Sequence, residues 1–61
     1  MSNVYSISVE KITEEGKLYM NYVVESITES DAKNVAVDAF ILKYPDICND
    51  LVVKVNGVRK S

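Results

Sequence analysis

The sequence predicts a small α+β domain with three strands and one helix in the order strand–strand–helix–strand (ββαβ). Three observations lead to this prediction. Two segments of alternating apolar and polar residues are joined by a turn sequence, a helix-start signal follows, and a third alternating segment lies near the end. We expect strands over residues ~4–12, ~18–26 and ~51–56, and a helix over residues ~29–44, within a single domain spanning residues 1–61.

The first two strands are expected to pair as a hairpin. The first segment places Tyr5, Ile7 and Val9 on one face, a period of two residues that is typical of a half-buried strand. The second segment repeats this pattern. Between them, the run Thr13-Glu14-Glu15-Gly16-Lys17 has turn chemistry, and Gly16 can adopt the positive φ that tight turns often need.

The predicted helix has both a start signal and a stop signal. Thr28 can accept a hydrogen bond from the backbone N–H near Asp31, and the Asp31 carboxylate suits the positive end of the helix dipole. Pro45 disfavours helical geometry in the residue before it. The helix is therefore expected to end near Lys43 or Tyr44.

The third strand is predicted from the alternation of Leu51, Val53 and Val55 with their neighbours. Asn56-Gly57 is the favoured dipeptide of a two-residue hairpin turn, so residues 58–61 are expected to form a strand stub or a frayed tail. We prefer the sheet order 2-1-3, mainly antiparallel, with the helix packed on one face. The alternative places the third strand parallel to the second through a right-handed crossover.

The helix carries two apolar sectors. The first is expected to face the sheet and to form the core (Ala32, Val35, Ala36, Ala39 and Phe40). The second is a stripe of Val37, Ile41 and Tyr44, which lies beyond what a three-stranded sheet can cover. Two interpretations stay open: the stripe folds under the loop over residues 46–50, against Ile47 and Cys48, or it is exposed and binds a partner.

The face of the sheet away from the helix is the second candidate for binding. Tyr19, Val23 and Val52 point to that face among polar residues, which suits either a solvated surface or a partner-binding one. The second strand is an edge strand with few charges in the preferred order. Such edges pair with other strands, so homodimerisation or addition of a partner's strand is expected there.

Composition restricts the chemistry. Cys48 is the only cysteine and the chain has no histidine, which excludes an internal disulfide, the usual zinc site and the commonest acid–base residue. We assign no catalytic, metal or cofactor-binding residues and expect no enzyme activity and no cofactor. A domain this small buries only about 60% of its unfolded surface. Small domains usually need a disulfide, a bound metal or association with another chain for stability. Because the first two are excluded, we expect self-association or a protein partner, and specifically a homodimer.

Nucleic acid is the alternative partner. Lys54, Arg59 and Lys60 gather in the C-terminal segment, and Tyr19 can stack on a base. A net charge of −2 argues against such a partner. The beginning of the sequence lacks the basic and apolar regions of a signal peptide, and no apolar stretch approaches membrane-spanning length. With one unpaired cysteine, these features predict a cytoplasmic protein without membrane contact.

The run Val24-Glu25-Ser26-Ile27-Thr28-Glu29-Ser30-Asp31-Ala32, with Ala36 four residues on, resembles the strand-to-helix junction of many short phage-encoded accessory proteins. Those proteins often share the order hairpin, helix, strand, and the resemblance covers most of the chain. It implies an accessory protein of the host cytoplasm that binds and modulates a host or phage enzyme, such as an antitoxin-like or counter-defence inhibitor. The resemblance assigns no functional residues. The leading hypothesis is a small protein–protein interaction module, and the alternative is a nucleic-acid-binding regulator.

Overall fold

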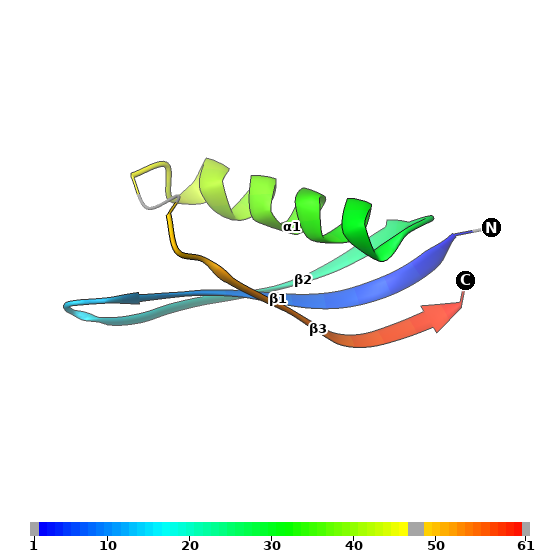
Figure 1. Ribbon diagram of the computed structural model, residues 1–61, viewed down its shortest axis with the longest axis horizontal. Coiled ribbons are helices and arrows are strands. Elements are labelled where there is room, and N and C mark those ends of the chain that lie inside the picture. The colour runs from blue at the N-terminus through cyan, green and yellow to red at the C-terminus, as the bar shows by residue number, and fades with distance from the viewer. Residues whose placement is uncertain (1, 47–48, 61) are drawn as a thin grey trace.

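The computed structural model describes residues 2–46 and 49–60. Its elements follow in the order β1 (Asn3–Thr13), β2 (Gly16–Ser26), α1 (Glu29–Lys43) and β3 (Val52–Lys60). The strands form one antiparallel sheet in the order β2-β1-β3, and α1 lies over one face of it (Figure 1). The predicted ββαβ fold and the strand order 2-1-3 are confirmed. The alternative pairing of the third strand with the second is not adopted, since β3 pairs with β1.

The β1–β2 hairpin is regular along its whole length. Its register runs from Asn3 opposite Ser26 to Thr13 opposite Gly16 without a shift. Gly16 adopts a φ of 141°, and the Thr13 hydroxyl donates a hydrogen bond of 2.9 Å to the Gly16 carbonyl. β3 pairs with β1 only as far as Glu10, so the tip of the hairpin projects past the third strand (Figure 1).

The third strand differs from the prediction. Asn56-Gly57 does not form a hairpin turn, and β3 continues through it to Lys60. The register with β1 shifts there: Val55 lies opposite Ile7 and Gly57 opposite Ser6, so that Asn56 is the extra residue of a β-bulge. The physical reason is the free edge of β1, whose backbone groups pair with the chain after Gly57 and hold it in the sheet. Residues 58–60 are therefore strand and not a tail.

The core lies between β1 and α1. It consists of three large residues from β1 and two alanines and one phenylalanine from α1 (Tyr5, Ile7, Val9, Ala32, Ala36 and Phe40). The small alanines allow the helix to approach the sheet closely. Val35 and Ala39 were also expected in this core, but Val35 is 52% exposed and Ala39 is half-buried. The buried residues follow a narrow i, i+4, i+8 stripe, and these two lie on its flank.

The predicted ends of the helix are confirmed. The Thr28 side chain accepts a hydrogen bond of 3.2 Å from the backbone N–H of Asp31, as an N-cap residue does. The helix ends at Lys43, and the backbone N–H of Tyr44 donates a 2.9 Å hydrogen bond to the Phe40 carbonyl. The cap thus fixes the start of α1 directly after β2, and Pro45 follows its end.

Candidate functional site

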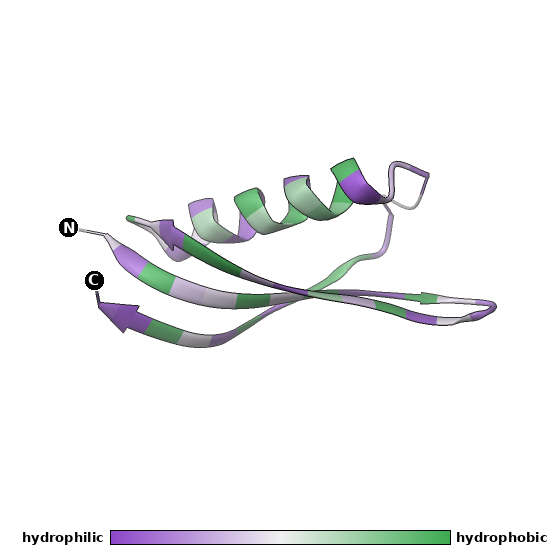
Figure 2. Ribbon diagram, turned by 180° about the vertical axis from the view of Figure 1, so that it is seen from behind, coloured by the Kyte–Doolittle hydropathy of each residue, from purple (hydrophilic) through white to green (hydrophobic). Residues whose placement is uncertain are grey.

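The helix covers one face of the sheet and leaves the other face open, as Figures 1 and 2 show from opposite sides. Strand alternation and register decide which side chains lie on the open face. On β1 these are the residues between the buried ones, namely Val4, Ser6, Ser8 and Glu10. Each has one neighbour from β2 and one from β3, and the rows are Glu25–Val4–Arg59, Val23–Ser6–Gly57, Asn21–Ser8–Lys54 and Tyr19–Glu10–Val52.

The open face has a hollow at the bulge. Its volume is about 330 Å³, and it is lined by small and apolar residues together with one arginine (Val4, Ser6, Val23, Gly57, Val58 and Arg59). The bulge explains the hollow, because it places Gly57 opposite Ser6, where an unbroken register would place Asn56. A Cβ added at Gly57 would meet no atom within 4 Å. A missing side chain therefore makes the hollow.

Apolar side chains border this hollow, and others lie on the open face beyond the polar row of Asn21, Ser8 and Lys54. Val23 is 73% exposed and Tyr19 is 51% exposed, and Val52 lies across the sheet from Tyr19. Ser8 of the central strand, between Asn21 and Lys54 on the same face, is buried. The two open-face residues predicted as a binding site, Tyr19 and Val23, thus lie on one exposed surface.

The charges on the open face are distributed unevenly. On the β2 side, Lys17 forms an ion pair of 3.8 Å with Glu10. On the β3 side, Lys54 and Arg59 point to the open face, and neither forms an ion pair with another residue in the described ranges. Lys60 is opposite Asn3 and belongs by alternation to the other face. The structure therefore brings two of the three predicted basic residues onto the surface that carries Tyr19.

The helix stripe predicted as a second binding surface lies on the other side of the sheet. Val37, Ile41 and Tyr44 are all half-buried. Tyr44 packs against the core, with its ring centroid 5.1 Å from that of Phe40. Ile47 and Cys48, the expected contacts in the following loop, lie outside the described residues. Stripe and open face therefore belong to separate surfaces.

Two features were not predicted from the sequence. One is the hollow, since Gly57 was interpreted as part of a turn. The other is an apolar flank of α1, which we define as Val35, Ala39 and Leu42; Leu42 is 84% exposed, Val35 is 52% exposed and Ala39 is half-buried. The i, i+4, i+7 spacing of these three residues was a signal that could have identified the flank.

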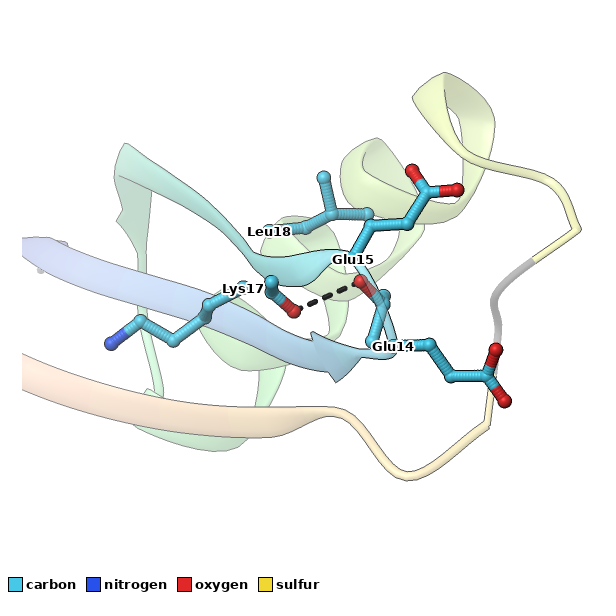
Figure 3. Close-up of a pocket in the computed structure, with 6 residues that line it drawn as sticks. Glu14, Glu15, Lys17 and Leu18 are labelled. Carbon is cyan, nitrogen blue, oxygen red and sulfur yellow. Dashed lines mark hydrogen bonds between the residues drawn. The ribbon is translucent and has the colours of Figure 1, made fainter.

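The tip of the hairpin forms a second, more polar hollow of about 500 Å³, lined by Thr13, Glu14, Glu15, Gly16, Lys17 and Leu18 (Figure 3). The carboxylates of Glu14 and Glu15 point in different directions, so they do not converge on one ligand atom (Figure 3). Within residues 2–46 and 49–60, no group of three histidine, cysteine, aspartate or glutamate side chains is placed to hold a metal ion. We therefore attribute this hollow to the shape of the hairpin turn and not to a ligand site.

No helix among the described residues is long and apolar enough to cross a membrane. Comparison with known proteins gives no relative: no protein-family model, no curated protein and no solved structure matches this chain.

Proposed function

We propose that this chain is a small protein–protein interaction module that binds a protein partner on the open face of its sheet. The observation that carries the proposal is the hollow at the bulge. It is an indentation lined in part by Val4 and Val23, with open space where Gly57 has no side chain. Protein interfaces concentrate binding energy where one large side chain fills such a depression and the surrounding contacts exclude water.

The chemistry around the hollow defines the partner segment. An apolar side chain suits Val4 and Val23, and an acidic side chain beside it suits Arg59, which borders the hollow and has no ion pair within the described residues. Lys54 lies on the same face two rows away. The partner segment proposed is therefore an apolar anchor next to an aspartate or a glutamate.

The biological role that fits this proposal is modulation of another protein without catalysis. The resemblance to short phage-encoded accessory proteins supports an inhibitor of a host or phage enzyme that acts in the host cytoplasm. In such a role the open face blocks or reshapes a surface of the enzyme, and no reactive side chain is needed.

Selection from a random peptide library displayed on phage, with the full chain as bait, tests the proposal. The enriched peptides should share an apolar residue beside an acidic one. Gly57→Leu fills the hollow and should weaken their binding by about tenfold or more. Ile27→Ser removes an exposed apolar side chain outside the hollow and should leave binding unchanged. Peptides without a common pattern, or peptides that bind Gly57→Leu as well as the original chain, would overturn the proposal.

A second candidate function is binding of single-stranded nucleic acid, favoured by the placement of Lys54 and Arg59 on the face that carries Tyr19. Glu10 and Glu25 lie on the same face and oppose it. This candidate predicts oligonucleotide binding that weakens steeply with salt and is lost when Lys54, Arg59 and Lys60 are replaced by glutamate. Fluorescence anisotropy with a labelled oligonucleotide at two salt concentrations separates the two functions.

A further inference from the structure

The sheet has two edge strands that differ in protection against pairing with another chain. β3 has a β-bulge and three cations, Lys54, Arg59 and Lys60, which are the features that natural sheets use to prevent edge pairing. β2 has neither protection. It is 11 residues long, its register is regular, and its only charged residues are Lys17 and Glu25, near opposite ends. β2 is thus an edge open to pairing.

We propose that a second copy of this chain pairs with β2, antiparallel and around a twofold axis at Asn21. In this register the whole strand is used, from Gly16 to Ser26, because Asn21 is its central residue. Lys17, which also forms an ion pair with Glu10 of its own chain, then lies opposite Glu25 of the second copy, and this arrangement occurs twice by symmetry. Tyr19 lies opposite Val23 of the second copy, an aromatic and β-branched pair that favours strand association. The edge is complementary to itself in both charge and side-chain type.

Other registers lose this match. A shift by one residue turns the helix-covered face of one copy toward the open face of the other. A shift by two residues in one direction places Glu25 opposite Glu15, a repulsive pair, and leaves Lys17 opposite Val23. The same shift in the other direction places Glu25 opposite Tyr19 and moves Lys17 beyond the end of the strand. The register centred on Asn21 therefore pairs both charges, and its nearest alternatives do not.

The position of α1 suits the same axis. The helix contacts β1 and β2 equally and β3 less, so it lies over the half of the sheet next to the β2 edge. Strands are about 4.8 Å apart, and a helix centred between β1 and β2 is therefore also about 4.8 Å from the twofold axis. The two helices of the pair would run antiparallel about 10 Å apart, which is close to the usual distance of packed helices.

The apolar flank of α1 (Val35, Ala39 and Leu42) lies on the β2 side of the helix. Figure 1 shows α1 above the sheet, running toward the hairpin tip, with β2 behind and β3 in front, and Figure 2 shows the reverse view. In a right-handed helix of this direction, the residue before each sheet-facing residue points toward β2. Val35 and Ala39 precede the buried Ala36 and Phe40 in this way. The strand edge and the helix flank therefore present one continuous surface to the second copy.

This inference goes beyond the proposed function, because the pair forms whether or not the open face binds a partner. The result is a six-stranded sheet with two helices on one face and two hollows on the other. Leu42, which is left exposed among the described residues of one chain, would be covered by the second copy.

The first test is the mass of the full chain in solution, measured by light scattering over a hundredfold range of concentration. We expect a dimer whose dissociation constant rises about tenfold or more for Leu42→Glu, which alters only an exposed side chain. Glu25→Lys should have a similar effect, and Lys17→Glu combined with Glu25→Lys should restore pairing. Val58→Glu, on the other edge, is the matched control. A monomer at all concentrations would overturn the proposal, as would a dimer that neither Leu42→Glu nor Glu25→Lys weakens.

The second test addresses the register. With Cys48→Ser as background, Asn21→Cys places two thiols across the axis at a Cα separation of about 4.5–5.5 Å, which a disulfide can span. Val23→Cys places them about 13 Å apart along the strands and cannot be bridged. Oxidation should therefore cross-link Asn21→Cys into a covalent dimer and leave Val23→Cys monomeric on a denaturing gel. Equal cross-linking of the two variants would overturn the register.

Discussion

The two faces of the sheet are formed by the same three strands, but their residues differ in size and in packing. On the face under α1, β1 contributes Tyr5, Ile7 and Val9, and all three are buried with two alanines and a phenylalanine of the helix. On the open face, β1 contributes Ser6 and Ser8 at the intervening positions. Folding requires a close volume match between sheet and helix side chains on the covered face only. The residues of the open face are free of this requirement, which makes them available for binding.

The largest difference between the faces is expected when one large side chain is removed from each. Phe40→Ala opens a cavity in the core and should lower the free energy of unfolding by ~3–5 kcal/mol. Val23→Ala removes an exposed side chain and should change it by less than about 0.5 kcal/mol. Urea unfolding followed by circular dichroism measures both. If both variants lowered the free energy of unfolding equally, the open face would contribute to stability as much as the covered face.

Enlarging a small residue on each face gives the next largest difference. Ala36→Leu forces extra atoms between α1 and the sheet and should lower the free energy of unfolding by about 1–3 kcal/mol. Gly57→Ala enters open space and should raise it by up to about 1 kcal/mol, because alanine restricts the unfolded chain. Thermal melting of the two variants is the measurement. A destabilised Gly57→Ala would show that the hollow is not empty space.

The N-cap of α1 is expected to have a smaller effect, limited to the covered face. Thr28→Ala removes the acceptor for the Asp31 N–H and should lower the free energy of unfolding by about 1 kcal/mol. Thr28→Ser keeps the hydroxyl and is the matched control. Peptide binding to the open face should be unchanged in Thr28→Ala. If the free energy of binding fell by more than the free energy of unfolding, the two faces would not be independent.

The difference between the faces also explains how far the sequence could predict the molecule. The alternation in β1 and β2 and the cap at Thr28 are local signals, and they predicted the hairpin, the start of the helix and the open-face positions of Tyr19 and Val23. The bulge could not be predicted in this way. Asn56-Gly57 suits a turn and a bulge alike, and the choice depends on pairing with the distant β1.

The helix shows the same limit. A helical wheel identifies apolar sectors, but it does not say where the helix lies across the sheet. Because α1 lies toward β2, Val35 and Leu42 are exposed, whereas the predicted stripe of Val37, Ile41 and Tyr44 is half-buried. Tertiary placement, which the local sequence does not encode, decides which sector is available to a partner.

The smallest expected effect comes from a tyrosine on the covered face. Burial raises the pKa of the Tyr22 hydroxyl above its ordinary value of 10.0, and the nearby Tyr44 hydroxyl raises it further. The folded state therefore favours protonated Tyr22. Its contribution to stability is fully present below pH 10.0 and is lost as the pH rises through the higher pKa of the folded state.

Tyr22→Phe should consequently reduce the fall in unfolding free energy just above pH 10.0, as measured by urea unfolding at a series of pH values. Tyr19→Phe removes a hydroxyl from the open face and controls for the loss of one tyrosine. An unchanged pH dependence in Tyr22→Phe would contradict the prediction, because burial under α1 would then have no effect on this hydroxyl. A reduced dependence in Tyr22→Phe alone would show that the partial burial of Tyr22 on the covered face sets the titration of this hydroxyl.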